Sequence, residues 1–273
     1  MRTRAITGFF FISVLIASAL LGPYVFITFF GFIATCSVYE FYKMVYVADK
    51  REPLLVAGSS VAACSILLGG AIYLNWLPAN TITFAILGLL FLYIATLYRR
   101  TAHPIQDLVF SLFGLLYVVV PFLFFIALGF VQGDFNGYIP LGFLILLWTN
   151  DTGAYLTGRS MGKHKLFERI SPNKTWEGFI GGVLLAMVGG GILSHCFEIF
   201  PLWCWLSIGF IIGVFGTLGD LVESMLKRNM GVKDSGSLLP GHGGLLDRFD
   251  GLLMAAPLVY LFLQFITSFV DSL

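Results

Sequence analysis

The chain alternates between long apolar runs and short polar segments. Nine runs are about 17–25 residues long, the length that an α-helix needs to cross the roughly 30 Å hydrocarbon core of a bilayer. They cover approximately residues 5–22, 24–42, 54–74, 80–98, 108–131, 138–157, 178–197, 202–222 and 251–270. Membrane helices tolerate Gly and Pro, so the 31 glycines do not argue against this pattern. We therefore predict an all-α polytopic membrane protein with about nine transmembrane helices.

The composition agrees with this pattern and excludes a soluble protein. Of the 273 residues, 58% are hydrophobic and only 11% are charged, against about 25% charged residues in an average soluble domain. So few polar side chains cannot cover the surface of a globule in water. The net charge of +1 also argues against a general nucleic-acid-binding surface, because such a surface needs an excess of basic residues.

The cysteines carry no sign of a metal site. Cys36, Cys64, Cys196 and Cys204 all lie within apolar runs. Their spacing is typical neither of zinc sites nor of disulfide frameworks. We predict that they are packing thiols.

The basic residues predict the orientation of the helices. All 16 Lys and Arg residues lie before the first run or after runs two, four, six and eight, and such residues accumulate in cytoplasmic loops. This pattern places the N-terminus in the cytoplasm and the C-terminus outside. A cleaved signal peptide is the alternative for the first run, because Ala17-Ser18-Ala19 is a small-x-small pattern. Removal of that run would, however, break the alternation of basic loops.

The polar residues divide the chain into two regions. We predict an N-terminal region of about five spans at residues 1–137 and a C-terminal region at residues 138–273, with cytoplasmic loops 158–177 and 223–250. Any catalytic groups are expected in the C-terminal region, because its two loops hold most of its ionisable residues. The ionisable residues at the span ends and loops of the N-terminal region are Glu40, Asp49, Glu52, His103 and Asp107. We expect these side chains to be solvated at the membrane interface, without a role in chemistry.

Carboxylates gather at the cytoplasmic ends of the last two runs. Positions i, i+3, i+4 and i+7 of one helical face are Asp220, Glu223, Ser224 and Lys227. Asp247 and Asp250 lie one turn apart at the start of the ninth run. Acids near membrane depth are costly, which favours a functional role over ordinary helix N-terminal acids. Asp220, Asp247 and Asp250 are therefore a candidate Mg²⁺ site, because Mg²⁺ prefers hard oxygen ligands.

Cations and glycines lie between these carboxylates. Lys227, Arg228 and Lys233 precede a Gly-rich stretch at residues 240–244. The backbone N–H groups of such a stretch are suited to anions. Together with the acids, these residues indicate a site for a metal-bound polyphosphate at the cytoplasmic face of the membrane.

The preceding cytoplasmic loop carries less specific features. Asp151 follows polar residues within the sixth run, and either an interior hydrogen bond or ligand binding would explain it. Residues 171–177 are typical of a capping turn before the seventh run. From that turn, Lys174 could reach a phosphate.

Two stretches of the C-terminal region carry a resemblance to a known family. Ser224, Lys227-Arg228, Lys233-Asp234 and the run His242-Gly243-Gly244-Leu245-Leu246-Asp247-Arg248-Phe249-Asp250 resemble the signature of the phosphatidate cytidylyltransferases, also called CDP-diacylglycerol synthases. A second family segment is similar to Asp151-Thr152-Gly153-Ala154-Tyr155, Gly158-Arg159, Gly162-Lys163, Ser171-Pro172 and Lys174-Thr175-Trp176-Glu177-Gly178. Glu168 departs from the family pattern, which more often has proline there. The first 140 residues carry no matching motif.

The resemblance implies that cytidylyl passes from CTP to phosphatidic acid, giving CDP-diacylglycerol and pyrophosphate. The enzyme would depend on Mg²⁺ and lie in a bacterial-type cytoplasmic (inner) membrane, with CTP and phosphatidic acid as its substrates. A second cation and a homo-oligomer are left open. The lipid phosphate can attack the α-phosphorus of CTP directly, so catalysis needs alignment and charge neutralisation but no protein nucleophile.

We assign hypothetical roles to the candidate residues on this basis. Asp220, Asp247 and Asp250 hold the metal, while Lys227 and His242 act as further catalytic groups; a structural role for His242 is the alternative. The candidate substrate-binding residues are Asp151, Arg159, Lys174, Ser224, Arg228, Lys233, Gly243, Gly244 and Arg248. Lys227 is expected to reach CTP, whereas Arg228, about 100° round the helix, is expected to reach the lipid phosphate.

Three alternative functions remain at this stage. A CDP-alcohol phosphotransferase shares the opening Asp247-x-x-Asp250-Gly251, but the rest of its motif is absent from the sequence. A CTP-dependent polyprenol or phytol kinase would use a similar metal and phosphate site. A membrane transporter would instead need acids at mid-bilayer on several spans, whereas the acids here gather near one face.

Overall fold

The computed structural model describes residues 2–49, 52–236 and 243–270, and it is almost entirely helical. The helices in chain order are α1 (Arg2–Leu20), α2 (Pro23–Asp49), α3 (Leu55–Tyr73), α4 (Ala85–Leu97), α5 (Pro104–Gly114), α6 (Val120–Leu128), α7 (Tyr138–Met161), α8 (Trp176–Phe197), α9 (Leu202–Asn229) and α10 (Asp250–Val270). Three short helical turns accompany them: η1 (Ala79–Phe84), η2 (Leu115–Val119) and η3 (Leu246–Arg248). Each of the nine predicted runs overlaps a helix, so the all-α prediction is confirmed.

Seven helices within the described residues are long and apolar enough to cross a membrane. These candidate spans are Pro23–Ala48, Leu55–Tyr73, Ala79–Leu97, Pro104–Leu128, Trp176–Phe197, Leu202–Asn229 and Asp250–Thr267. The apolar part of α1 is shorter, covering Gly8–Leu20, and α7 is not among the seven. The protein is therefore a polytopic membrane protein, while the count of nine spans and their orientation stay predictions.

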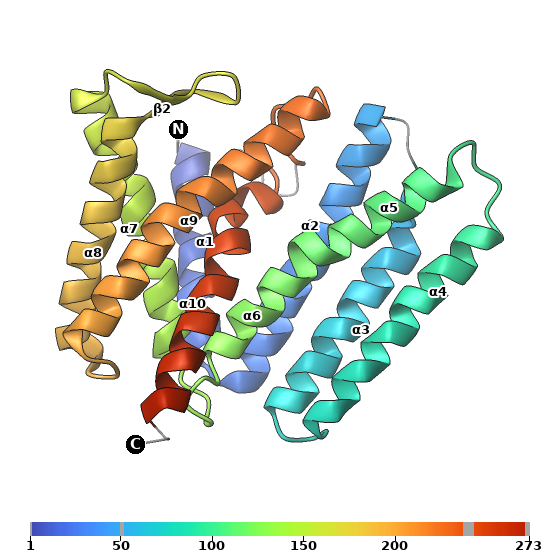
Figure 1. Cartoon of the computed structure of the whole chain (residues 1–273), viewed down its shortest axis with the longest axis horizontal. Coiled ribbons are helices and arrows are strands. Elements are labelled where there is room, and N and C mark those ends of the chain that lie inside the picture. Colours follow the sequence, from blue (N-terminus) through green and yellow to red (C-terminus); the bar gives the residue numbers. More distant parts are fainter. Residues whose placement is uncertain (1, 50–51, 237–242, 271–273) are drawn as a thin grey trace.

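Helices from both halves of the chain pack around one core. In Figure 1, α7, α8 and α9 lie together, α10 lies between α9 and α6, and α2, α3 and α4 follow on the other side. The ring of Phe249 contacts Phe11 of α1, Phe30 of α2 and Phe122 of α6 at centroid distances of 5.5–6.3 Å. Leu15 of α1 is fully buried as well. The first helix is thus part of the packed molecule.

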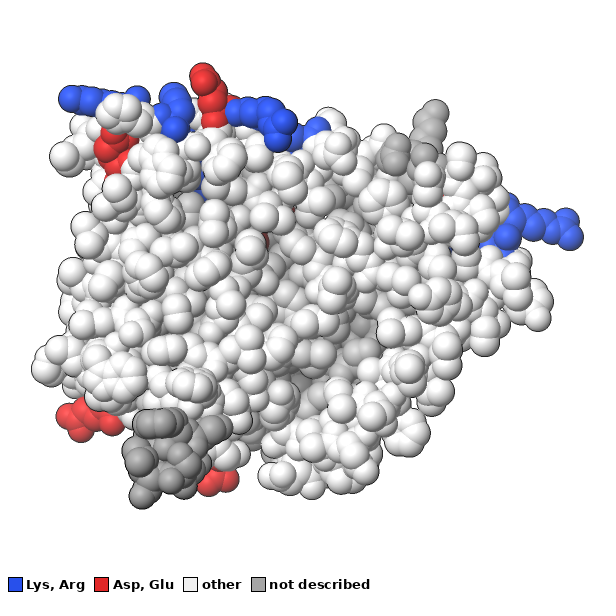
Figure 2. Space-filling view, in the orientation of Figure 1, with Lys and Arg blue, Asp and Glu red and all other residues white. Residues whose placement is uncertain are grey.

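The charged side chains lie at the ends of the helices. Figure 2 shows Lys and Arg along the edge near the N-terminus and at the turn beside α4 and α5, while the opposite edge shows only acids. A broad band without charge separates the two edges. This band is the surface expected to face lipid.

Of the cysteines, Cys204 packs in the core, whereas Cys64 and Cys196 are exposed, so the packing prediction is wrong for those two.

The continuous helix formed by α5 and α6 contains one turn that is wider than an α-helical turn. Helices α5 and α6 are joined without a break by η2, a π-helical turn at Leu115–Val119. Pro121 lies two residues after this turn, and a proline ring clashes with the carbonyl four residues earlier, which here belongs to Tyr117. The wider turn relieves such a clash and rotates the side chains around it.

The only sheet in the described part of the chain lies in the loop before α8. Strands β1 (Lys165–Phe167) and β2 (Ser171–Thr175) pair antiparallel. Thr175 then caps α8, because its hydroxyl oxygen accepts a hydrogen bond from the N–H of Gly178 at 3.2 Å. The predicted cap is confirmed, although residues 171–175 form a strand where the sequence indicated only a turn.

Candidate functional site

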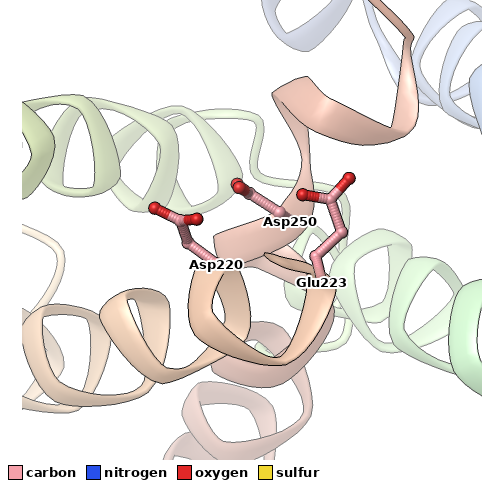
Figure 3. Close-up of side chains that lie close together, drawn as sticks. All are labelled: Asp220, Glu223 and Asp250. Carbon is pink, nitrogen blue, oxygen red and sulfur yellow. The ribbon is translucent and has the colours of Figure 1, made fainter. Parts of the chain in front are cut away.

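Three carboxylates meet where α9 crosses the start of α10. Figure 3 shows Asp220 and Glu223 on adjacent turns of α9 and Asp250 at the first residue of α10, with the carboxylates facing a common space. One carboxylate oxygen from each residue lies within 4.8 Å of the others. We call these three residues the carboxylate cluster. Ser224 supports it by donating a hydrogen bond to Asp220 at 3.2 Å.

Glycines allow the two helices to approach closely at this point. A Cβ atom at Gly219 would lie 2.5 Å from the backbone carbonyl oxygen of Asp250. A Cβ atom at Gly251 would lie 3.2 Å from the carbonyl oxygen of Gly216. Only the absence of side chains at these positions lets Asp220 and Asp250 share one space.

Asp247 does not belong to the carboxylate cluster. Its carboxylate accepts a hydrogen bond from Lys227 at 2.6 Å, and the same ammonium group donates to Glu223 at 2.7 Å. The backbone N–H groups of Ser235 and Gly244 also donate to Asp247, at 3.1 and 2.8 Å. The 3₁₀ turn η3 thus directs Asp247 toward Lys227, and it is Glu223 whose carboxylate lies beside those of Asp220 and Asp250. The expected role of Asp247 as a metal ligand stays a prediction.

The contacts of Asp247 affect its ionisation. Burial alone would raise the pKa of this carboxyl, but the hydrogen bonds from Lys227 and from the N–H of Gly244 hold the pKa below its usual value. The negative charge of the Asp247 carboxylate is thus balanced by the Lys227 ammonium and by backbone N–H groups. Lys227 is likewise engaged, because 11% of its side chain is exposed and its ammonium joins two acids.

A polar cavity of about 540 Å³ lies next to the carboxylate cluster. It is open between α7, the hairpin, α8 and α9, and its polar lining includes Asp151, Tyr155, Arg159, Asn173, Lys174 and Asp220. Lys174 forms an ion pair with Asp220, so the cavity and the cluster are directly connected. Cavities of this size hold small molecules such as nucleotides.

The cavity wall is fixed by the loop that precedes α8. Glu177, at the start of α8, accepts hydrogen bonds from the backbone N–H groups of Lys163 and His164 at 3.1–3.2 Å and contacts the His164 ring at 2.6 Å. Lys165 donates to the carbonyl oxygen of Pro172 across the hairpin at 2.5 Å. These contacts hold the strand that carries Lys174 against the helix end.

The other predicted residues are spread around the site. Arg159 is exposed and donates to the Tyr155 hydroxyl at 2.9 Å, and Arg228 is exposed and donates to the carbonyl oxygen of Val232 at 3.2 Å. Lys233 and Arg248 are exposed, and Arg248 interacts electrostatically with Asp151. His242 lies outside the described residues.

The two predicted glycines of the loop have separate structural reasons. Gly243 has a φ of +83°, a conformation that side chains rarely adopt, and its position would bring a Cβ atom to 3.0 Å from Asp247. Gly244 is buried and donates its N–H to Asp247. Both glycines therefore shape the turn that presents Asp247.

Two acids of the N-terminal region are buried, which corrects the expectation that they are solvated. Glu40 of α2 is 3% exposed and accepts hydrogen bonds from the N–H groups of Leu245 and Leu246 at 2.6 and 3.0 Å. Asp107 is also 3% exposed and accepts from the N–H of Glu52 at 2.8 Å. Glu40 caps the turn that carries Asp247, so the N-terminal region supports the site.

Sequence reasoning missed the place of Tyr117 beside the cluster. This residue belongs to the η2 turn, and it interacts electrostatically with Glu223, Asp250 and Asp220. The signal in the sequence is Pro121, four residues later in an apolar run, because it predicts a local departure from α-helix at Tyr117.

Comparisons with known proteins add to this geometry. Residues 2–266 match the model of the cytidylyltransferase family. A phosphatidate cytidylyltransferase from Staphylococcus haemolyticus is 44% identical over 169 residues, which are 62% of this chain and 64% of that protein. Similar proteins of the same name from Staphylococcus aureus strain COL and Staphylococcus saprophyticus are 35% identical over 268 residues and 33% identical over 264 residues. These two alignments each cover 96% of this chain and 99% of the relative.

Proposed function

Because this chain belongs to the cytidylyltransferase family, we propose that it transfers the cytidylyl group of CTP to phosphatidate, giving CDP-diacylglycerol and pyrophosphate. The names of its relatives support this choice of substrates. The structural observation that carries the proposal is the ion pair of Lys174 with Asp220, which joins a nucleotide-sized polar cavity to the carboxylate cluster. Apolar helices around that site suit a lipid substrate, and we propose the cytoplasmic (inner) membrane as its location.

The proposed reaction needs no covalent intermediate with the protein. An oxygen of the phosphatidate phosphate forms a bond to the α-phosphorus of CTP. The bond between that phosphorus and the oxygen leading to the β-phosphorus breaks, and its electron pair leaves with pyrophosphate. Catalysis then consists of aligning two anions that repel each other and of neutralising their charge.

The polar cavity is the proposed site of CTP. Lys174 and Arg159 supply positive charge along its wall, and Asn173 can donate or accept a hydrogen bond with a base or ribose. Lys174 reaches the cluster from this wall, so it would hold a phosphate next to Asp220. Arg248 is exposed close enough to Asp151 to interact with it, and we assign it to the same phosphate-binding group.

The carboxylate cluster fits Mg²⁺. Asp220, Glu223 and Asp250 offer hard oxygen ligands within 4.8 Å of one another. One oxygen of Glu223, Oε1, is buried and has no hydrogen-bond partner among the residues described, as expected of a ligand atom that awaits a cation. When bound there, Mg²⁺ would offset phosphate charge and help to orient the phosphates for in-line attack.

The proposed reaction can be tested with purified protein in detergent. CTP labelled in the cytosine ring should pass its label to the lipid when phosphatidate and Mg²⁺ are present, with release of pyrophosphate. A CTP-dependent polyprenol or phytol kinase would instead transfer a label from the γ-phosphate and leave cytosine in solution. Absence of cytosine label from the lipid would contradict the proposal, and transport without turnover would favour a membrane transporter.

A single substitution tests the carboxylate cluster. Asp250→Asn should reduce kcat at least about 100-fold, because loss of a metal ligand removes several kcal/mol of charge stabilisation from the transition state. The melting temperature should change little, since the new side chain has the same shape. Asp134→Asn, an exposed residue between α6 and α7, is the matched control and should retain full turnover. Normal kcat in Asp250→Asn would reject the metal assignment.

A further inference from the structure

Tyr117 presents a buried hydroxyl group that the protein leaves without a partner. No hydrogen bond to this hydroxyl exists within the described part of the chain, although the oxygen is inaccessible to solvent. The ring itself is held firmly: it stacks on Phe113 at a centroid distance of 5.4 Å and an angle of 7°, and it packs against Phe41 at 6.3 Å. A buried polar group without a partner is costly and calls for an explanation, such as a ligand.

The position of Tyr117 relates it to the carboxylate cluster. Phe122, five residues after Tyr117 in the same continuous helix, packs its ring 5.5 Å from that of Phe249, the residue before Asp250. Tyr117 also interacts electrostatically with Glu223, Asp250 and Asp220. Glu223 carries the second unpartnered group, its buried Oε1 atom. A hydroxyl donor and a carboxylate acceptor are thus both without a hydrogen-bond partner among the described residues.

Tyr117 does not line the polar cavity. Lys174, Asp151 and Asp220 line the cavity proposed for CTP, and Lys174 pairs with Asp220. Tyr117 is not among the residues that line this cavity, and it lies in Pro104–Leu128, one of the candidate membrane spans. A ligand that meets the Tyr117 hydroxyl would therefore lie among apolar helices, as a lipid does.

We propose that the Tyr117 hydroxyl donates a hydrogen bond to the phosphate of the lipid substrate, an inference that rests on the proposed function. A phosphate oxygen is an acceptor, and a phenol is a neutral donor whose hydrogen rotates to suit it. The π-helical turn η2 directs this donor, and the stacked Phe113 keeps it in place. The N-terminal region thereby supplies a substrate-binding residue to a site whose other groups come from the C-terminal region.

Tyr117→Phe tests the proposal, because it keeps the ring and its stacking while removing the hydroxyl. The KM for phosphatidate should rise about tenfold or more, as expected for loss of a hydrogen bond to a charged group. The KM for CTP should stay within about twofold, and the melting temperature should stay equal or rise, since an unpartnered buried hydroxyl is removed. A purely structural role would lower the melting temperature instead.

Tyr42→Phe is the matched control. The Tyr42 hydroxyl is also buried, but it donates to the carbonyl oxygen of Ser111 at 2.6 Å. Its removal should lower the melting temperature and leave the KM for phosphatidate unchanged. An unchanged KM for phosphatidate in Tyr117→Phe, or an effect on CTP alone, would overturn the proposal.

Lipid binding separates this inference from the proposed reaction. Native mass spectrometry of the detergent-solubilised protein should show weaker retention of phosphatidate by Tyr117→Phe than by wild type, with equal retention of diacylglycerol, which lacks the phosphate. Equal retention of phosphatidate by both proteins would reject the role of Tyr117. Absence of turnover in wild type would reject the proposed reaction, and the binding comparison would still decide on Tyr117.

Discussion

At the scale of single residues, Lys227 shows how burial changes the meaning of a charge. Helical spacing placed it on the face of Asp220 and Glu223, and we expected it to reach CTP. In the structure its ammonium is shared by Glu223 and Asp247, with hydrogen bonds of 2.7 and 2.6 Å. Lys227 therefore links α9 to the η3 turn, and we expect its effect on substrate binding to be indirect.

Lys227→Met should destabilise the protein by about 3 kcal/mol or more, because it leaves two buried carboxylates without their shared cation. Thermal unfolding in detergent would measure this loss. Arg228→Met is the control one residue along. Arg228 is exposed, and within the described part of the chain its side chain donates to a backbone carbonyl, so the change should stay within about 0.5 kcal/mol. An unchanged melting temperature with a raised KM for CTP in Lys227→Met would restore the direct role expected from the sequence.

Two acids of the N-terminal region were expected to be solvated but are buried, and their hydrogen-bond partners explain the difference. In the sequence, Glu40 and Asp107 lie near the ends of predicted apolar runs, where a single sequence gives no sign of a partner. Each accepts backbone N–H groups from a distant segment, Glu40 from the turn before α10 and Asp107 from the α2–α3 loop. A buried carboxylate is tolerated when hydrogen-bond donors surround it.

At the scale of elements, the crossing of α9 and α10 brings the carboxylates together. Gly219→Ala should lower both the melting temperature and kcat, because the added Cβ would lie 2.5 Å from the carbonyl oxygen of Asp250 and force the helices apart. Backbone atoms cannot rotate away from such a contact as a side chain can. Turnover and thermal unfolding measured on one preparation would test this.

A glycine of α8 supplies the control for that substitution. At Gly191, an added Cβ would meet only side-chain atoms at 3.8–4.0 Å, and alanine favours a helix over glycine by about 1 kcal/mol. Gly191→Ala should therefore keep turnover and leave stability equal or higher. Equal behaviour of the two alanine variants would show that the close crossing is not needed.

At the scale of the whole molecule, the charges define two sides. In the sequence, the basic residues precede the first apolar run or follow runs two, four, six and eight. These segments are predicted to face the cytoplasm, the side from which CTP would reach the site in this proposal. Alkaline phosphatase fused to the C-terminus should be active and green fluorescent protein at the same place should be dark. Fusions after Arg100, between α4 and α5, should give the reverse result. Fluorescence at the C-terminus would contradict the orientation.

The sequence by itself determined the membrane class, the helical ranges and the region of the site. Apolar run length sets helix length in a bilayer, so each predicted run found its helix. The positions of Asp220, Glu223 and Lys227 on one face also followed from the sequence, because residues three and four apart are neighbours on any helix. The family signature covers the C-terminal residues only, and it therefore gave no sign of Glu40 or Tyr117.

Only the tertiary structure decided which groups meet. Asp247 and Asp250 are three residues apart, but the 3₁₀ turn before α10 sends them in different directions, so Asp247 pairs with Lys227 while Asp250 joins Asp220 and Glu223. Tyr117 interacts electrostatically with the cluster although it lies about a hundred residues away in the chain, and a π-helical turn and a stacked ring hold it there. Periodicity fixes neighbours within one helix, whereas contacts between helices depend on crossing points and packing that one chain's local pattern does not encode.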